Sequence, residues 1–144
     1  MKNEALPVSV HSVGAVIRVG ATRFLFQLRD DDPGIIMPGR WGFFGGHVDG
    51  GEDWHAAIVR ELEEELGITG RAVDYLTEFA LPRPQGWVRR KLYEVRLAED
   101  ELDTLILKEG AAMKAMTAAE FLALEKIVFW DALGLAYVLQ EPRP

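Results

Sequence analysis

The feature that most constrains the fold is the stretch from residue 53 to residue 67, which reads DWHAAIVRELEEELG. Its apolar residues recur at helical spacing, so the pattern predicts an α-helix over Asp53–Leu66. Asp53 can cap the first turn, and Gly67 can end the helix in a left-handed conformation. Such a helix has one apolar stripe, and that stripe must pack against a core.

Four glutamates lie in the second half of this helix, and most of them are on its apolar side. On a helical wheel with Trp54 at zero, Glu61 falls at about −20° and Glu65 at about +20°, within the stripe. Glu64 falls on its shoulder at about −80°, and Glu63 points away. Because an unpaired buried carboxylate is costly, this crowding indicates a divalent cation with oxygen ligands. The helix alone leaves one alternative open, an exposed helix end with solvated acids.

Composition limits the class of protein. A chain of 144 residues, with 49% hydrophobic and 27% charged residues, suits one globular domain spanning residues 1–144. It has no apolar run long enough to cross a membrane, no signal-peptide pattern at its start and no cysteine. We therefore expect a cytoplasmic protein without a membrane partner. The net charge of −7 argues against a nucleic-acid partner, although an acidic site can bind an anionic small ligand through divalent cations.

The rest of the chain is predicted to form a sheet and two further helices. A loop rich in Asp, Pro and Gly spans Arg29–Arg40. β-Rich segments bounded by turn residues predict strands over Val8–Val19, Thr22–Leu28, Trp41–Val48, Ala72–Leu81, Trp87–Leu97 and Leu102–Leu107. A capping-box pattern begins a helix at Thr117, which runs to about Leu124, and a last helix covers Val128–Gln140. This order predicts an α/β protein with a mixed sheet covered by helices.

A longer motif surrounds the glutamate helix. Gly46 is followed by five residues, Glu52, seven residues, and then the run from Arg60 to Ile68, RELEEELGI. This resembles the complete Nudix box, G-x5-E-x7-R-E-U-x-E-E-x-G-U, where U is a bulky aliphatic residue. The chain is similar to Nudix hydrolases on this basis. The resemblance implies the Nudix fold, an α/β/α sandwich with a mixed β-sheet between helices.

The resemblance also implies a site that binds Mg²⁺ or Mn²⁺, which carries the diphosphate of a small-molecule nucleotide substrate. The metal ligands that it implies are the carboxylates of Glu61, Glu64 and Glu65, with support from Glu52 and a backbone carbonyl of Gly45 or Gly46. Arg60 would orient one of these carboxylates. The implied reaction is hydrolysis of a nucleoside diphosphate linked to another moiety, in which Glu61 acts as ligand and base. Some family members take their base from a later loop, and the candidate for that role here is Glu109.

The sequence gives much weaker indications of which residues contact the substrate. Residues before the box and on the later strands could stack a base or bind phosphate: Trp41, Phe43, His47, Trp87 and Arg89. Ordinary packing is the more common explanation for such side chains. Phe44 stands where the family often has a proline.

Several alternatives stay open at this point. A nucleotide-sugar, ADP-ribose and a non-standard nucleoside triphosphate are all compatible substrates. A non-catalytic Nudix-fold nucleotide sensor is the second function considered, although such sensors usually have a degenerate box. An isopentenyl diphosphate isomerase is disfavoured, because that chemistry uses a cysteine. Since many Nudix proteins dimerise, a homodimer is also considered.

Overall fold

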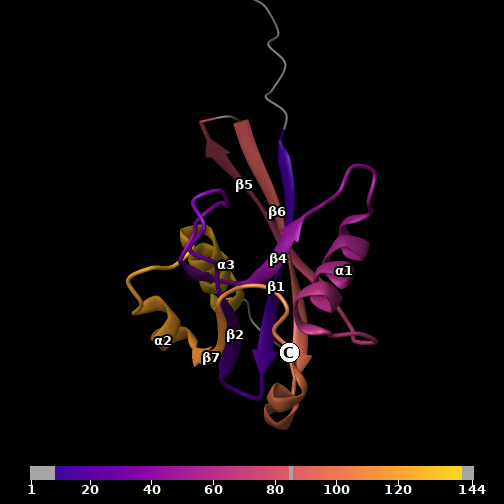
Figure 1. Ribbon diagram of the computed structural model, residues 1–144, viewed down its shortest axis with the longest axis vertical. Coiled ribbons are helices and arrows are strands. Elements are labelled where there is room, and N and C mark those ends of the chain that lie inside the picture. Colours follow the sequence, from indigo (N-terminus) through magenta and orange to yellow (C-terminus); the bar gives the residue numbers. More distant parts are fainter. Residues whose placement is uncertain (1–8, 85, 141–144) are drawn as a thin grey trace, which may run out of the picture.

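The computed structural model describes residues 9–84 and 86–140 of the chain (Figure 1). The predicted start of the first strand at Val8, and Gln85 in the predicted turn, lie outside these residues. The strands are β1 (Val10–Val19), β2 (Arg23–Leu28), β3 (Trp41–Gly42), β4 (Phe44–His47), β5 (Asp74–Arg83), β6 (Gly86–Leu97) and β7 (Ala112–Thr117). The helices are α1 (Trp54–Leu66), α2 (Ala118–Leu122) and α3 (Phe129–Gln140), with a 3₁₀ helix, η1 (Glu99–Thr104).

The strands form one mixed sheet. β1 is parallel to β6 and antiparallel to β2 and β4, while β5 pairs antiparallel with β6, and β7 with β2. β1 and β2 pair only through Ile17–Val19 and Arg23–Leu25. Beyond that point the two strands diverge, because β4 takes the free edge of β1 and β3 pairs with β2. The short β3–β4 segment therefore fills a gap between neighbouring strands.

Helices cover both faces of this sheet. On one face α1 buries Ile58, Leu62 and Leu66 against alternate residues of β1 and β6. On the other face α2 and α3 bury Phe121 and Leu135 against the opposite set of strand residues. Figure 1 shows α1 on one side of the strands and α2 and α3 on the other. The α/β/α sandwich predicted from the sequence is confirmed.

Two predicted strands differ from the structure. Leu102–Leu107 is not a strand, because residues 99–104 form η1 and the Glu101 carboxylate accepts a hydrogen bond from the Ala98 N–H at 2.9 Å. The strand β7, which follows it, was not predicted. Trp41–Val48 is broken at Phe43, whose N–H bonds to the buried Asp131 rather than to a strand.

Among residues 9–84 and 86–140, no helix has both the length and the apolar character that crossing a membrane requires. This agrees with the sequence, which has no apolar run of that length.

Candidate active site

The glutamate helix is built as its sequence predicts. The Asp53 carboxylate accepts a hydrogen bond from the Ala56 N–H at 3.1 Å, and Gly67 ends the helix in the left-handed region with φ 70°. Glu61 and Glu65 are buried, whereas Glu63 and Glu64 are exposed. The helix therefore points two of its four acids into the protein.

Three carboxylates meet beside this helix. Oxygen atoms of Glu61, Glu65 and Glu109 lie within 4.8 Å of one another. A glycine pair on β4 makes room for the two helix carboxylates. The Gly45 N–H donates to Glu65 Oε2 at 3.1 Å, and a Cβ atom at Gly46 would lie 2.5 Å from Glu61 Oε1. The strand backbone can approach the carboxylates this closely only because these residues lack side chains.

Crowding and burial change the acidity of this cluster. Burial raises the pKa of Glu65 to about 9, and the negative charges of Glu61 and Glu109 add to the rise. Burial also raises the pKa of Glu61, with the Arg60 guanidinium acting in the opposite direction. Three oxygen donors that repel one another form the kind of donor set that a hard divalent cation binds. The residues present therefore fit the metal that the box implies.

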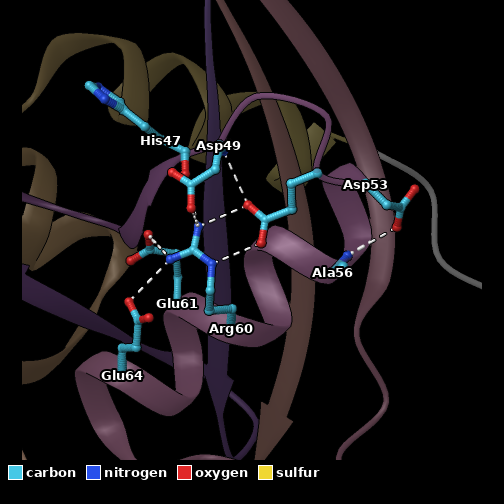
Figure 2. A network of polar contacts seen from close by, with 8 residues as sticks. His47, Asp49, Asp53, Ala56, Arg60, Glu61 and Glu64 are labelled. Carbon is cyan, nitrogen blue, oxygen red and sulfur yellow. Dashed lines mark hydrogen bonds and ion pairs between the residues drawn. The ribbon is translucent and has the colours of Figure 1, made fainter.

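Arg60 links the other acids of the box to this cluster (Figure 2). Its Nε and Nη2 atoms donate to both oxygens of Glu52, at 2.8 and 3.0 Å. Its Nη1 donates to Glu61 at 3.0 Å and to Glu64 at 3.1 Å, and Nη2 also reaches the His47 carbonyl at 3.2 Å. Glu52 and Glu64 thus lie beside the guanidinium rather than within the group formed by Glu61, Glu65 and Glu109.

Glu109 reaches the helix from a loop far along the chain. The loop is bonded to the last turn of α1, since the Ile106 N–H donates to Leu66 O at 3.3 Å and the Lys108 N–H donates to Glu65 O at 2.8 Å. These bonds satisfy carbonyls that a helix end otherwise leaves without a partner. The same contacts bring the Glu109 carboxylate to the two buried glutamates.

These acids open onto a cleft of about 490 Å³. It lies where β1 and β2 diverge, and its lining includes Glu61, Glu64, Glu65 and Glu109. Its apolar lining includes Ile36, Met37, Phe43, Val128 and Trp130. Further charged residues in the lining are Arg29, Arg90, Asp30 and Asp131. One cleft therefore joins an acidic group, apolar surface and positive charge, which suits a ligand with a phosphate and an apolar or aromatic part.

The predictions from the sequence did not include a buried ion pair that lines this cleft. Arg90 Nε lies 3.1 Å from Asp131 Oδ1, and Asp131 Oδ2 accepts from the Phe43 N–H at 2.9 Å. Arg90 Nη1 donates to Ser12 Oγ and to the Val13 carbonyl. Burial raises the pKa of Asp131, while the Arg90 charge opposes this rise. A usable signal was present, because Asp131 is the single charged residue in the segment FWDALGLAYVLQ.

The predicted substrate contacts divide into two groups. Phe43 and His47 line the cleft. Trp41 packs against the core below α2 and α3 instead. Trp87 lies on β6 opposite Pro82 of β5, and Arg89 is paired with Glu78 at 2.6 Å. Those three residues are outside the lining of the cleft.

Comparison with known proteins agrees with this geometry. The model of the NUDIX domain matches residues 9–139. A MutT protein from Methanosarcina mazei Go1 has a similar structure, with a TM-score of 0.78, 19% identity, and coverage of 97% of this chain and 100% of that chain. The NUDIX domain of Shewanella oneidensis NrtR, complexed with ADP ribose, has a TM-score of 0.76, 17% identity, and coverage of 97% and 92%.

A third similar structure is the E. coli dihydroneopterin triphosphate pyrophosphohydrolase, with a TM-score of 0.72, 21% identity, and coverage of 96% of this chain and 100% of that chain. A comparison with curated proteins found no match. At these identities the solved structures show a shared fold, and the domain match shows the family. The chain belongs to the Nudix family, whose enzymes are pyrophosphohydrolases that cleave phosphorus-containing anhydrides.

Proposed function

We propose that this protein is an Mg²⁺-dependent pyrophosphohydrolase, also able to use Mn²⁺, that cleaves the diphosphate of a nucleoside diphosphate linked to another moiety. A nucleotide-sugar, ADP-ribose and a non-standard nucleoside triphosphate are the substrate classes proposed. The observation that carries the proposal is the group formed by Glu61, Glu65 and Glu109 at one side of the cleft. The apolar residues that line the same cleft support a nucleoside as the other half of the ligand.

Glu61, Glu65 and Glu109 would hold the metal, with Glu64, Glu52 and a carbonyl of Gly45 or Gly46 as further oxygen donors. A bound metal would offset the negative charge of the diphosphate and would lower the pKa of a water molecule. Arg60 orients its acidic partners, since one planar guanidinium bonds Glu52, Glu61 and Glu64 together. The chain therefore contributes to the reaction by holding the carboxylates of Glu52, Glu61 and Glu64 in a fixed arrangement around Arg60.

A carboxylate must also accept the proton of the attacking water. Of the two bases expected from the sequence, the surroundings favour Glu109. Glu61 is buried and already accepts a hydrogen bond from Arg60, so an attacking water reaches it less readily than it reaches an exposed carboxylate. Glu109 is exposed and lies on a loop that lines the cleft. We therefore assign proton acceptance to Glu109, and the ligand role to Glu61.

The test is hydrolysis of a panel of nucleotides with Mg²⁺ or Mn²⁺, with the products identified. Glu65→Gln and Glu64→Gln are expected to lower kcat by about 10²–10⁴-fold while the protein stays folded. Glu63→Gln is the matched control, because Glu63 lies on the same helix and is exposed. Full activity in the Glu65 and Glu64 variants would refute the metal assignment. Tight nucleotide binding without turnover in the unchanged protein would favour the nucleotide sensor instead.

A further inference from the structure

Gln27 is a buried polar residue whose position needs an explanation. It lies on β2, where it faces Gly42 of β3 on one side and Met113 of β7 on the other, and it is only 5% exposed. A buried amide is destabilising unless its groups are hydrogen-bonded. Its Nε2 donates to the backbone carbonyl of Glu109 at 3.1 Å. The amide therefore connects the centre of the sheet to the residue that we assign as proton acceptor.

Gly110, the next residue, packs directly on this amide. Its φ of 94° lies in the region that favours glycine, and a Cβ atom there would lie 2.7 Å from Gln27 Nε2 and 2.8 Å from Gln27 Cγ. A side chain at this position would meet both a backbone restriction and a clash. Gln27 and Gly110 thus fit each other, and their contact sets the course of the chain just after Glu109.

Two backbone N–H groups on either side of Glu109 are bonded to other elements. The Lys108 N–H donates to Glu65 O at 2.8 Å, and the Ala111 N–H donates to Leu28 O at 2.9 Å. The Glu109 carboxylate lies within 4.8 Å of the carboxylates of Glu61 and Glu65, so its position depends on how the loop is held. The Gln27 bond acts directly on the backbone of Glu109.

We infer that Gln27 and Gly110 are positioning residues, which hold the Glu109 carboxylate against Glu61 and Glu65. This inference rests on the proposed function, since it takes Glu109 to be part of the metal and water site. It concerns residues outside the Nudix box, on β2 and in the loop before β7. Both residues also line the cleft, and the inference concerns their action through Glu109, which should lower kcat, whereas loss of a direct substrate contact should raise KM.

The test is a double-mutant cycle between Gln27 and Glu109. We expect Gln27→Leu and Gly110→Ala each to lower kcat about 10- to 100-fold, with KM changed less than threefold. Because both act through Glu109, Gln27→Leu is expected to cause little further loss in a Glu109→Gln background. Lys108→Met is the matched control, since its side chain lies on the same loop without contacting Gln27, and its kcat should stay within twofold.

Binding of Mn²⁺ alone, followed by electron paramagnetic resonance, gives a readout that does not depend on turnover. Gln27→Leu and Glu109→Gln are expected to weaken Mn²⁺ binding to a similar extent, while a thermal unfolding curve establishes that each variant is folded. Additive losses of kcat, or unchanged Mn²⁺ affinity in Gln27→Leu, would overturn the inference while leaving the proposed function intact. Full activity and unchanged Mn²⁺ affinity in Glu109→Gln would remove its basis. Inactivity of the unchanged enzyme on every nucleotide would count against the proposed function alone.

Discussion

Glu65 combines an ionisable side chain with almost complete burial, since it is 2% exposed. Burial raises the pKa of Glu65 to about 9, so its carboxyl group holds a proton far more tightly than an exposed glutamate does. Arg60 has the opposite effect on the acids that it touches, for example by lowering the pKa of Glu52 through their hydrogen bond. Glu65 and Glu52, two glutamates of one motif, therefore have different acidities, because one faces the core and the other faces a guanidinium.

A first prediction concerns Glu65→Gln in the presence of a chelator. The folded protein holds the Glu65 proton up to a pH of about 9, whereas the unfolded chain releases it near 4.5. The free energy of unfolding therefore falls as the pH rises between these values. We expect Glu65→Gln to stabilise the metal-free protein by about 2 kcal/mol at pH 8, and to have little effect near pH 4.5. Urea unfolding at both pH values measures this, and equal stability at pH 8 would contradict it.

A second prediction uses two glycines of the same segment. A Cβ atom at Gly46 would lie 2.5 Å from Glu61 Oε1, whereas at Gly50 nothing lies within 4 Å. Gly46→Ala should therefore displace the Glu61 carboxylate and weaken Mn²⁺ binding by about tenfold or more. Gly50→Ala should bind Mn²⁺ as the unchanged protein does. Titration calorimetry distinguishes the two, and equal affinities would show that Glu61 tolerates the displacement.

Helix α1 and the β3–β4 segment illustrate what could be predicted for whole elements. The helix, its caps and the inward side of its acids follow from the spacing of residues 53–67, so they were predictable. The break at Phe43 was not, because it depends on Asp131, which is 88 residues away in the sequence. Glu109 could be suggested as a loop acid, but its closeness to Glu65 depends on bonds between that loop and the end of α1. Long-range contacts of this kind leave no local pattern.

A third prediction concerns the ion pair between Arg90 of β6 and Asp131 of α3. Arg90 and Asp131 form a buried pair that also bonds to Ser12 and Phe43, so removing one partner leaves a charge without compensation. We expect Asp131→Ala to lower the free energy of unfolding by about 3 kcal/mol. Glu99→Gln, which removes an exposed partner of Arg23, should leave the unfolding midpoint almost unchanged. Guanidinium denaturation of both variants measures these effects. Equal unfolding midpoints for the two variants would refute the prediction that the buried pair stabilises the protein more than the exposed pair does.

The molecule as a whole carries a negative net charge, yet its helix α3 exposes several apolar side chains. Its net charge is −7, yet the outer side of α3 presents Phe129, Leu133 and Tyr137, which are 52%, 51% and 39% exposed. These residues recur every four positions and form a stripe, at the end of which Tyr137 also packs edge-on against Phe79 of β5. The helix is apolar on both sides, which is unusual for a helix facing water.

A fourth prediction follows for the state of the protein in solution. Because the stripe formed by Phe129, Leu133 and Tyr137 carries no charge, we expect concentration-dependent self-association in the micromolar range. This bears on the homodimer considered from the sequence, which stays a prediction. Leu133→Glu should shift sedimentation velocity profiles toward the monomer, because it adds a charge to the centre of the stripe. Identical profiles at all concentrations would exclude a contact through this face.

The divergence of β1 and β2 bears on how readily this protein can change its specificity. The cleft is opened by the course of the main chain, since β3 and β4 separate two strands that otherwise pair. Its apolar lining includes Ile36, Met37 and Trp130, none of which is fully buried. Substitutions at these positions can therefore alter recognition without removing core contacts. We expect substitutions at these three positions to change ligand binding with little effect on stability, in contrast to substitutions at buried lining residues such as Phe43 and Asp131.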